Sequence, residues 1–579
     1  ALYSELESAV RSQLGDDRDA VLQRSFDARM VGQAYETPFI DAPDGTIDEH
    51  AVAVMVDRFH DTYERRSGNR FAATPVQGVT FRVRASVSID RADYAKIPAR
   101  KDGGPKPFRH ATLEHLDGAP LNAGEFERGT LRAGDLIVGP AIVREPLSTT
   151  FLDTSSSSVG SASSLLPSRP DMNSRPAEEL DLRTLSEADF TARYGAGRFT
   201  CEVLANRARY VAEHICTALL HRAFSPIITF SQDFVGAVIG APDDGYPLTA
   251  VNKGNVIFLG SLSTGVRNTV REYGLERLAP GDVLICNDPF RVGNHVNDMC
   301  FIRPVFHEDV VVSFIVIRAH QLDMGGTVAG GFSLLKANVY ENGLVMSPQL
   351  MFRGDEPVKE TMRTIVDNTR FGDTLLPDFF TIRACCALGE RLLNESIDRY
   401  GITAWAGAMR YNLDLAAANM RAGITSLPDG RWAGEDWVDS DGIDAETAYR
   451  LHATVTKCGS QLEVDLSGSS RQACTALNAT ALDAQTAVAL AVKLVLDPYT
   501  PFTSGLYRDI DVVIPPGSIT SAEPDAAVMF YFEVQSALVN AMLRALAVPL
   551  GPRAIGGAYG STNLHTGEGR NADGTPWFS

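Results

Sequence analysis

The chain has 579 residues, 44% of them hydrophobic and 22% charged, which allows several domains with cores of their own and predicts a soluble globular protein. Its formal net charge of −19 at pH 7 argues against nucleic acid or an anionic membrane as a partner. No apolar run looks long enough to span a bilayer, and the first residues show no secretory signal. The eight cysteines are scattered without a C-x-x-C pair, so we expect reduced thiols and a cytoplasmic location.

Residues 1–153 predict a small α+β domain. A capping box at Thr46–Glu49 starts a helix whose apolar residues recur at helical spacing from Val52 to Tyr63. Alternation of apolar and polar residues from Val79 to Ile89 then predicts a half-exposed strand. The serine- and proline-rich residues 154–180 cannot bury a core, and we expect them to form a linker.

Residues 181–579 predict a large domain with helices and a mixed sheet. An amphipathic helix is expected from Thr200, with an apolar face that runs from Leu204 to Leu219. Asp233 stands in the polar loop that follows, shortly before a strand-like run from Val235 to Ile239. The expected fold class is therefore α+β or mixed α/β, multidomain, with the chemistry carried by this large domain.

The stretch from Asn287 to Gly326 gathers histidines and carboxylates beside turn residues. Within it, Val310–Ile317 is a β-branched and aromatic run that is typical of a buried strand, and a His-Glu-Asp connection can turn the chain back onto a preceding strand. His295 and Asp298 lie ahead of the preceding strand, whereas His320 lies just past the end of the buried one. A hairpin would therefore bring these three side chains together.

Two neutral imidazoles and a carboxylate suit a divalent transition-metal ion and leave positions open for water or substrate. A structural zinc site would more often have four protein ligands, many of them cysteines. The alternative is a polar turn network in which the same side chains bond to the backbone. A His-x-x-Asp pattern with one distant histidine is compatible with both interpretations.

Several motifs, in this order, resemble the hydantoinase B/5-oxoprolinase family: Asn287-Asp288-Pro289-Phe290, the turn with His295 and Asp298, Pro304-Val305-Phe306, the Ala-His-x-x-Asp-x-Gly-Gly segment at 319–326, and Glu341-Asn342-Gly343-Leu344. That family includes the metal-bearing subunits of acetone and acetophenone carboxylases. It also includes the B components of ATP-dependent hydantoinases, caprolactamase and 5-oxoprolinase. The resemblance implies a divalent metal held by the His/Asp/His set, with manganese or zinc as the expected ion and iron as an alternative.

The resemblance also implies further site residues. Asp233 stands where the family has Asp-Phe-Ser, and this aspartate lies near the metal in related amidohydrolases, so we expect a fourth ligand or an acid–base group. Asp323 belongs to the Ala-His-x-x-Asp motif. We expect Asp233, His295, His320 and Asp323 to take part in catalysis.

Residues 1–153 resemble the C-terminal part of hydantoinase A, including Gly139-Pro140-Ala141 and the Ser-Thr-Thr ending at Thr150. In the family an actin-like ATPase portion ahead of this region handles the nucleotide. The sequence has neither a G-x-x-x-x-G-K-[ST] motif nor an Asp-Gly-Gly-Thr phosphate loop. We therefore expect ATP and Mg²⁺ to bind an actin-like ATPase partner in a hetero-oligomer, or a part of the protein outside this sequence. The family's glycine-rich tail does not appear before Ser579, so we expect a C-terminal truncation.

Departures from the family pattern bear on the reaction. The chain has Phe258 where a histidine is frequent, Gln321 where amidohydrolases commonly have a second histidine, Asn297 within the His/Asp turn, and Asn342 between Glu341 and the glycine. These changes affect the hydrolase pocket more than the metal ligands. We therefore expect a ketone carboxylase, in which the partner phosphorylates bicarbonate and the ketone, and CO2 joins the enolate at the metal. The alternative is an ATP-dependent cyclic amide hydrolase, and a second alternative is a non-catalytic scaffold that docks the ATPase.

Overall fold

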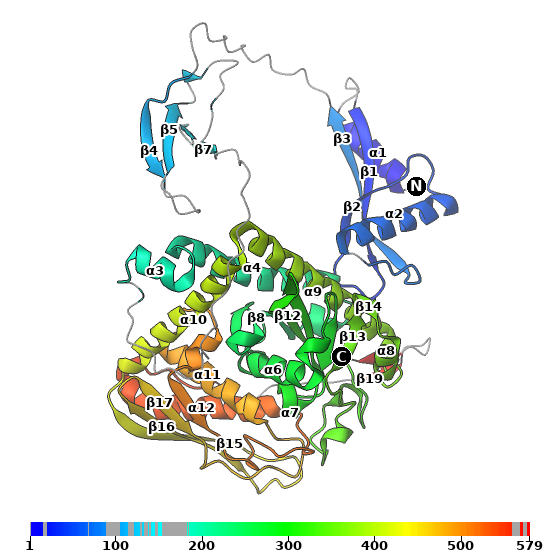
Figure 1. Ribbon diagram of the computed structural model, residues 1–579. Coiled ribbons are helices and arrows are strands. Elements are labelled where there is room, and N and C mark those ends of the chain that lie inside the picture. Colours follow the sequence, from blue (N-terminus) through cyan, green and yellow to red (C-terminus); the bar gives the residue numbers. More distant parts are fainter. Residues whose placement is uncertain are drawn as a thin grey trace.

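The computed structural model describes residues 2–14, 20–67, 69–87, 105–113, 121–127, 130–131, 137, 141–144, 149–152, 182, 184–558, 568–570 and 576–578. The predicted linker, residues 154–180, lies outside these ranges. The described residues form the mixed α+β, multidomain arrangement that the sequence predicts, with several separate sheets (Figure 1). The eight cysteines are free thiols, six of them buried, in agreement with the sequence.

The N-terminal sheet has the order β2-β1-β3 and is antiparallel. Its elements are β1 (Ala20–Met30), β2 (Thr37–Asp41) and β3 (Val76–Val87), accompanied by α1 (Leu2–Leu14) and α2 (Glu49–Ser67). The predicted helix and strand correspond to α2 and β3. The carboxylate of Asp48 accepts the N–H of Ala51 at 2.8 Å, which explains why α2 begins here. Phe26, Met30 and Phe59 form the centre of the small core of this unit.

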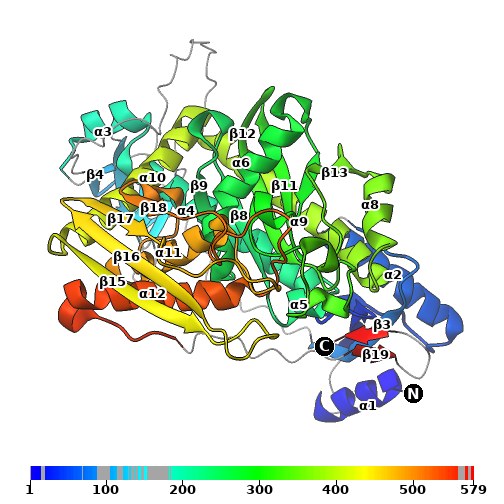
Figure 2. The same cartoon turned by 90° about the horizontal axis from the view of Figure 1, so that it is seen from below.

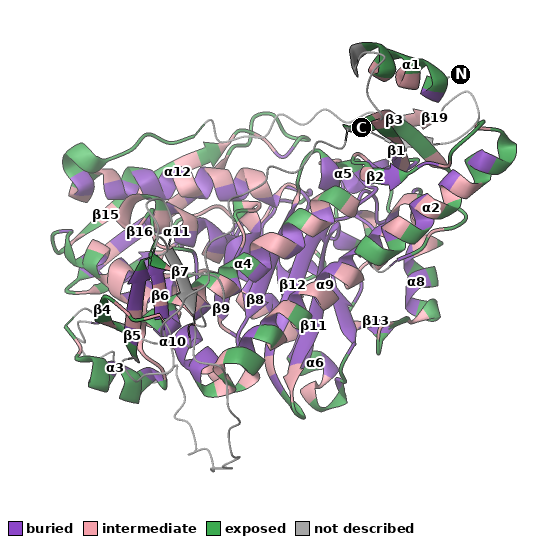
Figure 3. Cartoon of the chain, turned by 90° about the horizontal axis from the view of Figure 1, so that it is seen from above, coloured by how far each residue is buried: buried purple, intermediate pink, exposed green. Residues whose placement is uncertain are grey.

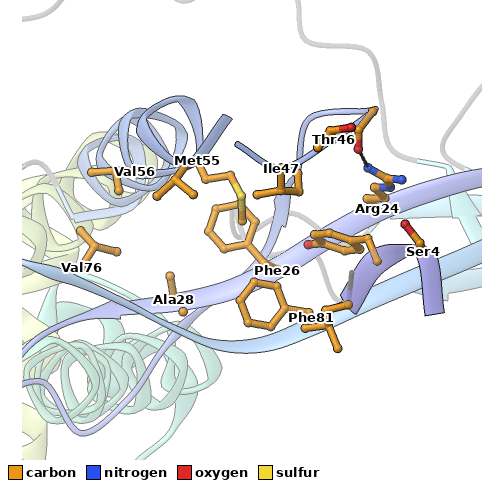
Figure 4. Close-up of a pocket in the computed structure, with 15 residues that line it drawn as sticks. Ser4, Arg24, Phe26, Ala28, Thr46, Ile47, Met55, Val56, Val76 and Phe81 are labelled. Carbon is orange, nitrogen blue, oxygen red and sulfur yellow. Dashed lines mark hydrogen bonds between the residues drawn. The ribbon is translucent and has the colours of Figure 1, made fainter. Parts of the chain in front are cut away.

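A cavity of about 590 Å³ lies beside α1 and α2, over β1 and β3. Figure 4 shows Phe26, Ile47, Met55 and Phe81 around it, so its lining is mainly apolar. At its polar end, the guanidinium of Arg24 is already paired with Glu7 at 2.7 Å. None of the site residues predicted from the sequence lines this cavity.

A second small sheet has the order β4-β5-β6-β7, and its β5–β6 pair is parallel. The strands are β4 (Arg109–Leu113), β5 (Leu121–Glu127), β6 (Ala141–Arg144) and β7 (Thr149–Leu152). The buried carboxylate of Glu125 joins neighbouring strands through ion pairs with Arg109 at 3.0 Å and Arg144 at 2.6 Å. A separate short pair consists of β19 (Glu568–Arg570) and β20 (Pro576–Phe578).

The seven-stranded sheet has the order β14-β13-β10-β11-β12-β8-β9 and is antiparallel throughout. Its strands are β8 (Phe234–Ile239), β9 (Leu248–Val251), β10 (Val283–Cys286), β11 (Asp298–His307), β12 (Val310–His320), β13 (Gln349–Arg353) and β14 (Glu356–Pro357). The predicted hairpin is confirmed as β11–β12, in which Asp298 is the register partner of His320. Side chains alternate between the two faces, so a strand covered on both sides is apolar almost without interruption.

Helices cover both faces of this sheet (Figure 3). Ile315 and Ile317 pack in the core formed with α4 and α9, whereas Phe314 and Val316 pack in the core shared with α6, α11 and α12. The helices are α3 (Glu187–Tyr194), α4 (Arg198–Arg222), α5 (Pro226–Thr229), α6 (Leu262–Tyr273), α7 (Pro289–Val292), α8 (Lys359–Val366), α9 (Gly372–Tyr400), α10 (Ile402–Thr425), α11 (Ala481–Leu496) and α12 (Tyr531–Leu550). Helix α4 begins two residues before the predicted Thr200, because Gly197 takes the N-cap position.

Short 3-10 helices connect these elements: η2 (Pro242–Asp244), η3 (Val256–Ser261), η4 (Leu275–Arg277), η5 (Ala329–Gly331), η6 (Val339–Glu341), η7 (Ser504–Tyr507) and η8 (Gly551–Arg553). A further four-stranded sheet comprises β15 (Gly430–Val438), β16 (Tyr449–Cys458), β17 (Gln461–Asp465) and β18 (Ile510–Val513), with β17 parallel to β18. Helix α12 lies along β15 and β16 (Figure 2).

The segment Tyr531–Arg553 is, within the described part of the chain, a helix long and apolar enough to cross a membrane. This corrects the expectation that the sequence holds no such run. In the fold, 61% of its most apolar window is buried. Leu538, Met542 and Leu546 pack in the core that includes residues of the seven-stranded sheet and of the β15–β18 sheet. Burial on more than one side therefore explains the apolar composition of the helix.

Candidate metal centre

The β11–β12 hairpin brings His295, Asp298 and His320 together, as predicted. Nδ1 of His320 lies 2.9 Å from Oδ1 of Asp298, and Nε2 of His295 lies 3.4 Å from Oδ2 of the same carboxylate. Possible ligand atoms of the three residues all lie within 4.8 Å of one another, and all three side chains are buried. Asp298 is the first residue of β11 and His320 the last of β12, so both belong to the strands rather than to the flanking turns.

A tight turn places His295 ahead of β11. Gly293 and Asn294 have φ values of 86° and 64°, in the left-handed region that favours glycine. The backbone N–H of Asn294 donates to the carboxylate of Asp483 at 2.8 Å, and its side-chain oxygen accepts from the buried guanidinium of Arg318. Residues from α11 and β12 therefore hold the turn from two sides.

Asp233 lies at the edge of the cluster. Its Oδ2 is 3.6 Å from Nδ1 of His320, and its backbone oxygen accepts the N–H of His320 at 3.0 Å. Asn255 donates to Oδ1 of Asp233 at 2.7 Å. The Asp233 side chain is 25% exposed, compared with 0% for Asp298, so Asp233 is on the side of the cluster that solvent reaches.

Asp323 belongs to a different network. Its carboxylate accepts the backbone N–H of Gly330 at 2.9 Å and of Arg370 at 2.8 Å, and it forms an ion pair with the Arg370 guanidinium at 3.2 Å. Thr369 donates a further hydrogen bond to it at 3.1 Å. These contacts tie the loop after β12 to the segment before α9, and Asp323 is not part of the His/Asp/His cluster.

Two aromatic residues that the sequence did not single out complete the cluster. The hydroxyl of Tyr531, the first residue of α12, donates to Oδ2 of Asp298 at 3.1 Å. The ring of Phe332 lies 5.9 Å from the His295 ring and 5.8 Å from the His320 ring, centroid to centroid. Tyr531 is 233 residues away from Asp298 in the chain, so no spacing rule links it to the hairpin.

The hydantoinase B/oxoprolinase family matches residues 197–579, which is more than half of the chain and includes the whole cluster. The chain belongs to this family. The B component of a D-/L-hydantoinase from a Pseudomonas species is 28% identical over 364 residues, which are 60% of this chain and 61% of that protein. The resemblance found in the sequence is therefore confirmed.

Two solved structures share the fold. The ATP-dependent caprolactamase of Pseudomonas jessenii aligns with a TM-score of 0.57 and 24% identity, over 61% of each chain. Nucleotide-free acetone carboxylase aligns with a TM-score of 0.59 and 17% identity, over 67% of this chain and 53% of that one. The aligned part of the present chain thus spans less than two thirds of the length of each of these three proteins.

The electrostatics of this hydantoinase B cluster favour metal ligation. Burial lowers the pKa of His295 to about 4, so this imidazole is neutral near pH 7. Burial acts to raise the pKa of Asp298, but the charges of His295 and His320 outweigh it and the pKa is lowered. Burial acts to lower the pKa of His320, but the hydrogen bond and charge of Asp298 raise it. Near pH 7 an incoming cation would therefore meet a carboxylate and a neutral imidazole. Below the raised pKa of His320 it would also displace a proton from that ring.

The donor set fits a divalent ion. Nε2 of His320 is buried and has no hydrogen-bond partner among the described residues, which is the state expected of a nitrogen kept for a metal. One possible ligand atom from each of His295, Asp298 and His320 lies within 4.8 Å of the other two, which is compatible with a shared ion. The cluster is thus compatible with a divalent metal, whose identity these distances do not specify.

Proposed function

We propose that this chain is the metal-bearing subunit of an ATP-dependent enzyme that acts on a carbonyl group activated by phosphorylation. The buried cluster of His295, Asp298 and His320 carries this proposal. A divalent ion held there would supply a Lewis acid for a carbonyl or enolate oxygen, or lower the pKa of a water molecule. ATP and Mg²⁺ would be handled by an actin-like ATPase subunit, a division of labour supported by relatives that are themselves B and beta components of larger enzymes. We place this hetero-oligomer in the cytoplasm.

The chain's own residues would prepare the site. Tyr531 holds the carboxylate of Asp298 in place through its hydrogen bond, and Phe332 covers both imidazoles. Such cover excludes water, which would otherwise destroy an enolate or an acyl phosphate. Asp233, on the side that solvent reaches, is placed to become a fourth ligand or to transfer a proton there.

Ketone carboxylation is the reaction that we propose first, with bicarbonate as the source of the carboxyl group. The amidohydrolases resembled by this sequence commonly carry a second histidine where this chain has Gln321. The Gln321 side chain, just past the end of β12, donates to the carbonyl of Ala319 at 2.8 Å. An amide in that position cannot serve as the base that activates a water molecule.

Cyclic amide hydrolysis is the second candidate. It is favoured by sequence relatives, because the B component of a hydantoinase and the beta component of the Pseudomonas jessenii caprolactamase are each 28% identical to this chain over their aligned regions. In this reaction, phosphorylation of the amide oxygen would prepare the ring for attack by water.

One experiment separates these functions. The purified chain is combined with its ATPase partner, ATP and labelled bicarbonate, and a ketone is compared with a hydantoin and a lactam. Label fixed only with the ketone supports carboxylation, and ring opening without label supports hydrolysis. Metal analysis of the same chain tests the scaffold alternative. A complex of normal activity in which this chain holds no stoichiometric manganese, zinc or iron would overturn the proposal of a metal centre.

A further inference from the structure

Lys336 is a buried lysine in the loop that covers the His/Asp/His cluster. Its side chain is 1% exposed, and its ammonium donates a hydrogen bond to the carbonyl of Gly331. An ammonium carries three N–H donors, yet within the described ranges this is the one acceptor that Lys336 meets. A buried cation without a paired anion is costly, so a fold rarely keeps one without a use for it.

The cover loop, residues 330–336, places this ammonium beside the cluster. The side-chain amide of Asn297, which lies between the two ligands of the turn, donates to the carbonyl of Gly330 at 3.3 Å. Lys336 binds the carbonyl of Gly331. The next residue, Phe332, lies parallel to the His320 ring and edge-on to the His295 ring. The ammonium therefore contacts the backbone of Gly331, and the residue after Gly331 is Phe332, whose ring lies beside both histidines.

Lys336 also interacts electrostatically with the cluster. The charge of Lys336 contributes to the lowered pKa of His295. Burial lowers the pKa of Lys336 itself to about 8, against the attraction of Glu341 and Asp323 and together with the repulsion of Arg370. Lys336 is thus still largely protonated near pH 7, although burial disfavours its charge.

The two carboxylates that attract Lys336 are already bound by other groups. Asp323 forms an ion pair with Arg370 at 3.2 Å. Glu341 accepts the backbone N–H of Ala337 and the side-chain amide of Asn338. Within the described part of the chain neither carboxylate forms an ion pair with Lys336, so the ammonium keeps N–H donors for an anionic group.

We propose that Lys336 is a substrate-binding residue that takes the oxyanion of the activated substrate, a carboxylate or a phosphate, beside the metal centre. This inference rests on the proposed function, since both candidate reactions pass an anionic group to this site. A lysine suits the task because its ammonium is a point charge on a flexible stem that can leave the Gly331 carbonyl for an incoming oxygen.

Anion binding by the full-length chain tests this role without turnover. Isothermal titration with sulfate, a phosphate-like anion of constant charge, and with acetate compares the wild type, Lys336→Met and Lys336→Arg. We expect Lys336→Met to weaken binding of the recognised anion by about 10- to 100-fold, and Lys336→Arg to keep part of it. The exposed Lys359→Met is the matched control and should bind like the wild type. Weaker binding of sulfate by Lys336→Met would identify a phosphate as the recognised group, and weaker binding of acetate would identify a carboxylate.

Equal affinity of the wild type and folded Lys336→Met for both anions, or no binding of either anion by the wild type, would overturn the role. Should Lys336→Met fail to fold, the wild type alone still decides, since anion affinity must fall as the pH rises through about 8. An affinity that stays flat across that range rejects the proposal. Metal analysis of the same samples keeps the two ideas apart, because absence of a metal would refute the proposed function but not the anion dependence on Lys336.

Discussion

Asp298 is the residue on which the cluster depends. Its side chain is fully buried and meets His295, His320 and Tyr531 through its two oxygens. A buried carboxylate is stable when cations and donors surround it, and these three groups supply that environment. The pKa shifts of the two histidines have opposite directions although both rings touch the same carboxylate, because His320 has the closer contact.

Replacing either histidine should remove the metal. His295→Ala and His320→Ala each delete one ligand from an open site, so we expect the metal content and turnover to collapse while the circular dichroism spectrum is retained. Elemental analysis of the purified variants measures this. The exposed His50→Ala serves as the control and should keep its metal. Normal metal content in both cluster variants would refute the ligand assignment.

Tyr531→Phe removes the hydroxyl that orients Asp298. Loss of such a supporting hydrogen bond typically weakens metal affinity by about 10- to 100-fold, and we expect this range. Competition with a fluorescent chelator measures the affinity. Tyr507→Phe is the matched control, because the Tyr507 hydroxyl is buried without a partner among the described residues and its removal costs nothing there. Equal affinities of the two variants would exclude a supporting role for Tyr531.

Metal affinity should rise with pH in the acidic range. His295, with a pKa of about 4, is already neutral, and Asp298, with a lowered pKa, is already ionised. His320 has a raised pKa, so below that value the ion must displace its proton, and above it the dependence levels off. Titration calorimetry in two buffers of different ionisation enthalpy counts the protons released. A pH-independent affinity with no proton release would contradict this account.

Helix α11 supports the site through its first turn. The carboxylate of Asp483 accepts the backbone N–H and the hydroxyl of Thr480, both at 2.8 Å, and forms a capping box. Its other oxygen accepts the N–H of Asn294, the residue before His295 of the cluster. The helix terminus and the metal turn are therefore joined through a single side chain.

Asp483→Ala should lower stability and metal affinity together. The substitution removes a cap worth about 1 kcal/mol and leaves the buried N–H of Asn294 without a partner, at a cost of about 1–3 kcal/mol. Thermal unfolding and metal titration measure the two effects. Asp189→Ala in the exposed capping arrangement of α3 is the control, and it should lower stability slightly and leave metal affinity unchanged. A metal affinity unaffected by Asp483→Ala would disprove the coupling.

At the scale of the whole molecule, loops of the N-terminal unit contact the end of α4, the residue Phe224 shortly after it, and α9. The ring of Phe71 lies 5.7 Å from Phe224 and 6.4 Å from Phe380, and Gln33 donates to the carbonyl of Arg222 at 3.2 Å. Arg383 of α9 donates to the side chain of Asn69 at 2.9 Å. A small apolar contact with polar neighbours thus joins the N-terminal unit to α9 and to the end of α4.

Phe71→Ala should loosen this contact. The substitution removes the aromatic ring that contacts Phe224, shortly after α4, and Phe380 of α9. We therefore expect faster amide hydrogen exchange in residues 20–87 and little change in β11 and β12. Hydrogen–deuterium exchange with mass spectrometry measures both regions. Val79→Ala, which shortens an exposed side chain of β3, is the control and should leave exchange unchanged. Wild-type exchange in Phe71→Ala would show that the ring does not hold the contact.

Local patterns in the chain predicted much of the fold, and their failures have physical causes. The apolar run at Val310–Ile317 predicts β12 because a strand covered on both faces has no polar side. The sequence pattern did not identify α12 as a long apolar segment. The helix is apolar because other elements pack on several of its sides, and the residues near it in the sequence do not predict that packing. The domain boundaries and the linker remain predictions.

The sequence by itself determined the family, and it determined that His295, Asp298 and His320 meet, because the three residues belong to one hairpin whose register follows from local side-chain alternation. That they hold a metal remains a prediction. Only the tertiary structure decided which distant groups complete the site. Packing of α12 and α11 onto the sheet brought Tyr531 to Asp298 and Asp483 to the turn at Asn294, whereas the contacts of Asp323 with Arg370 keep it out of the cluster. Contacts between residues far apart in the chain depend on how layers pack, and local periodicity carries no record of that packing.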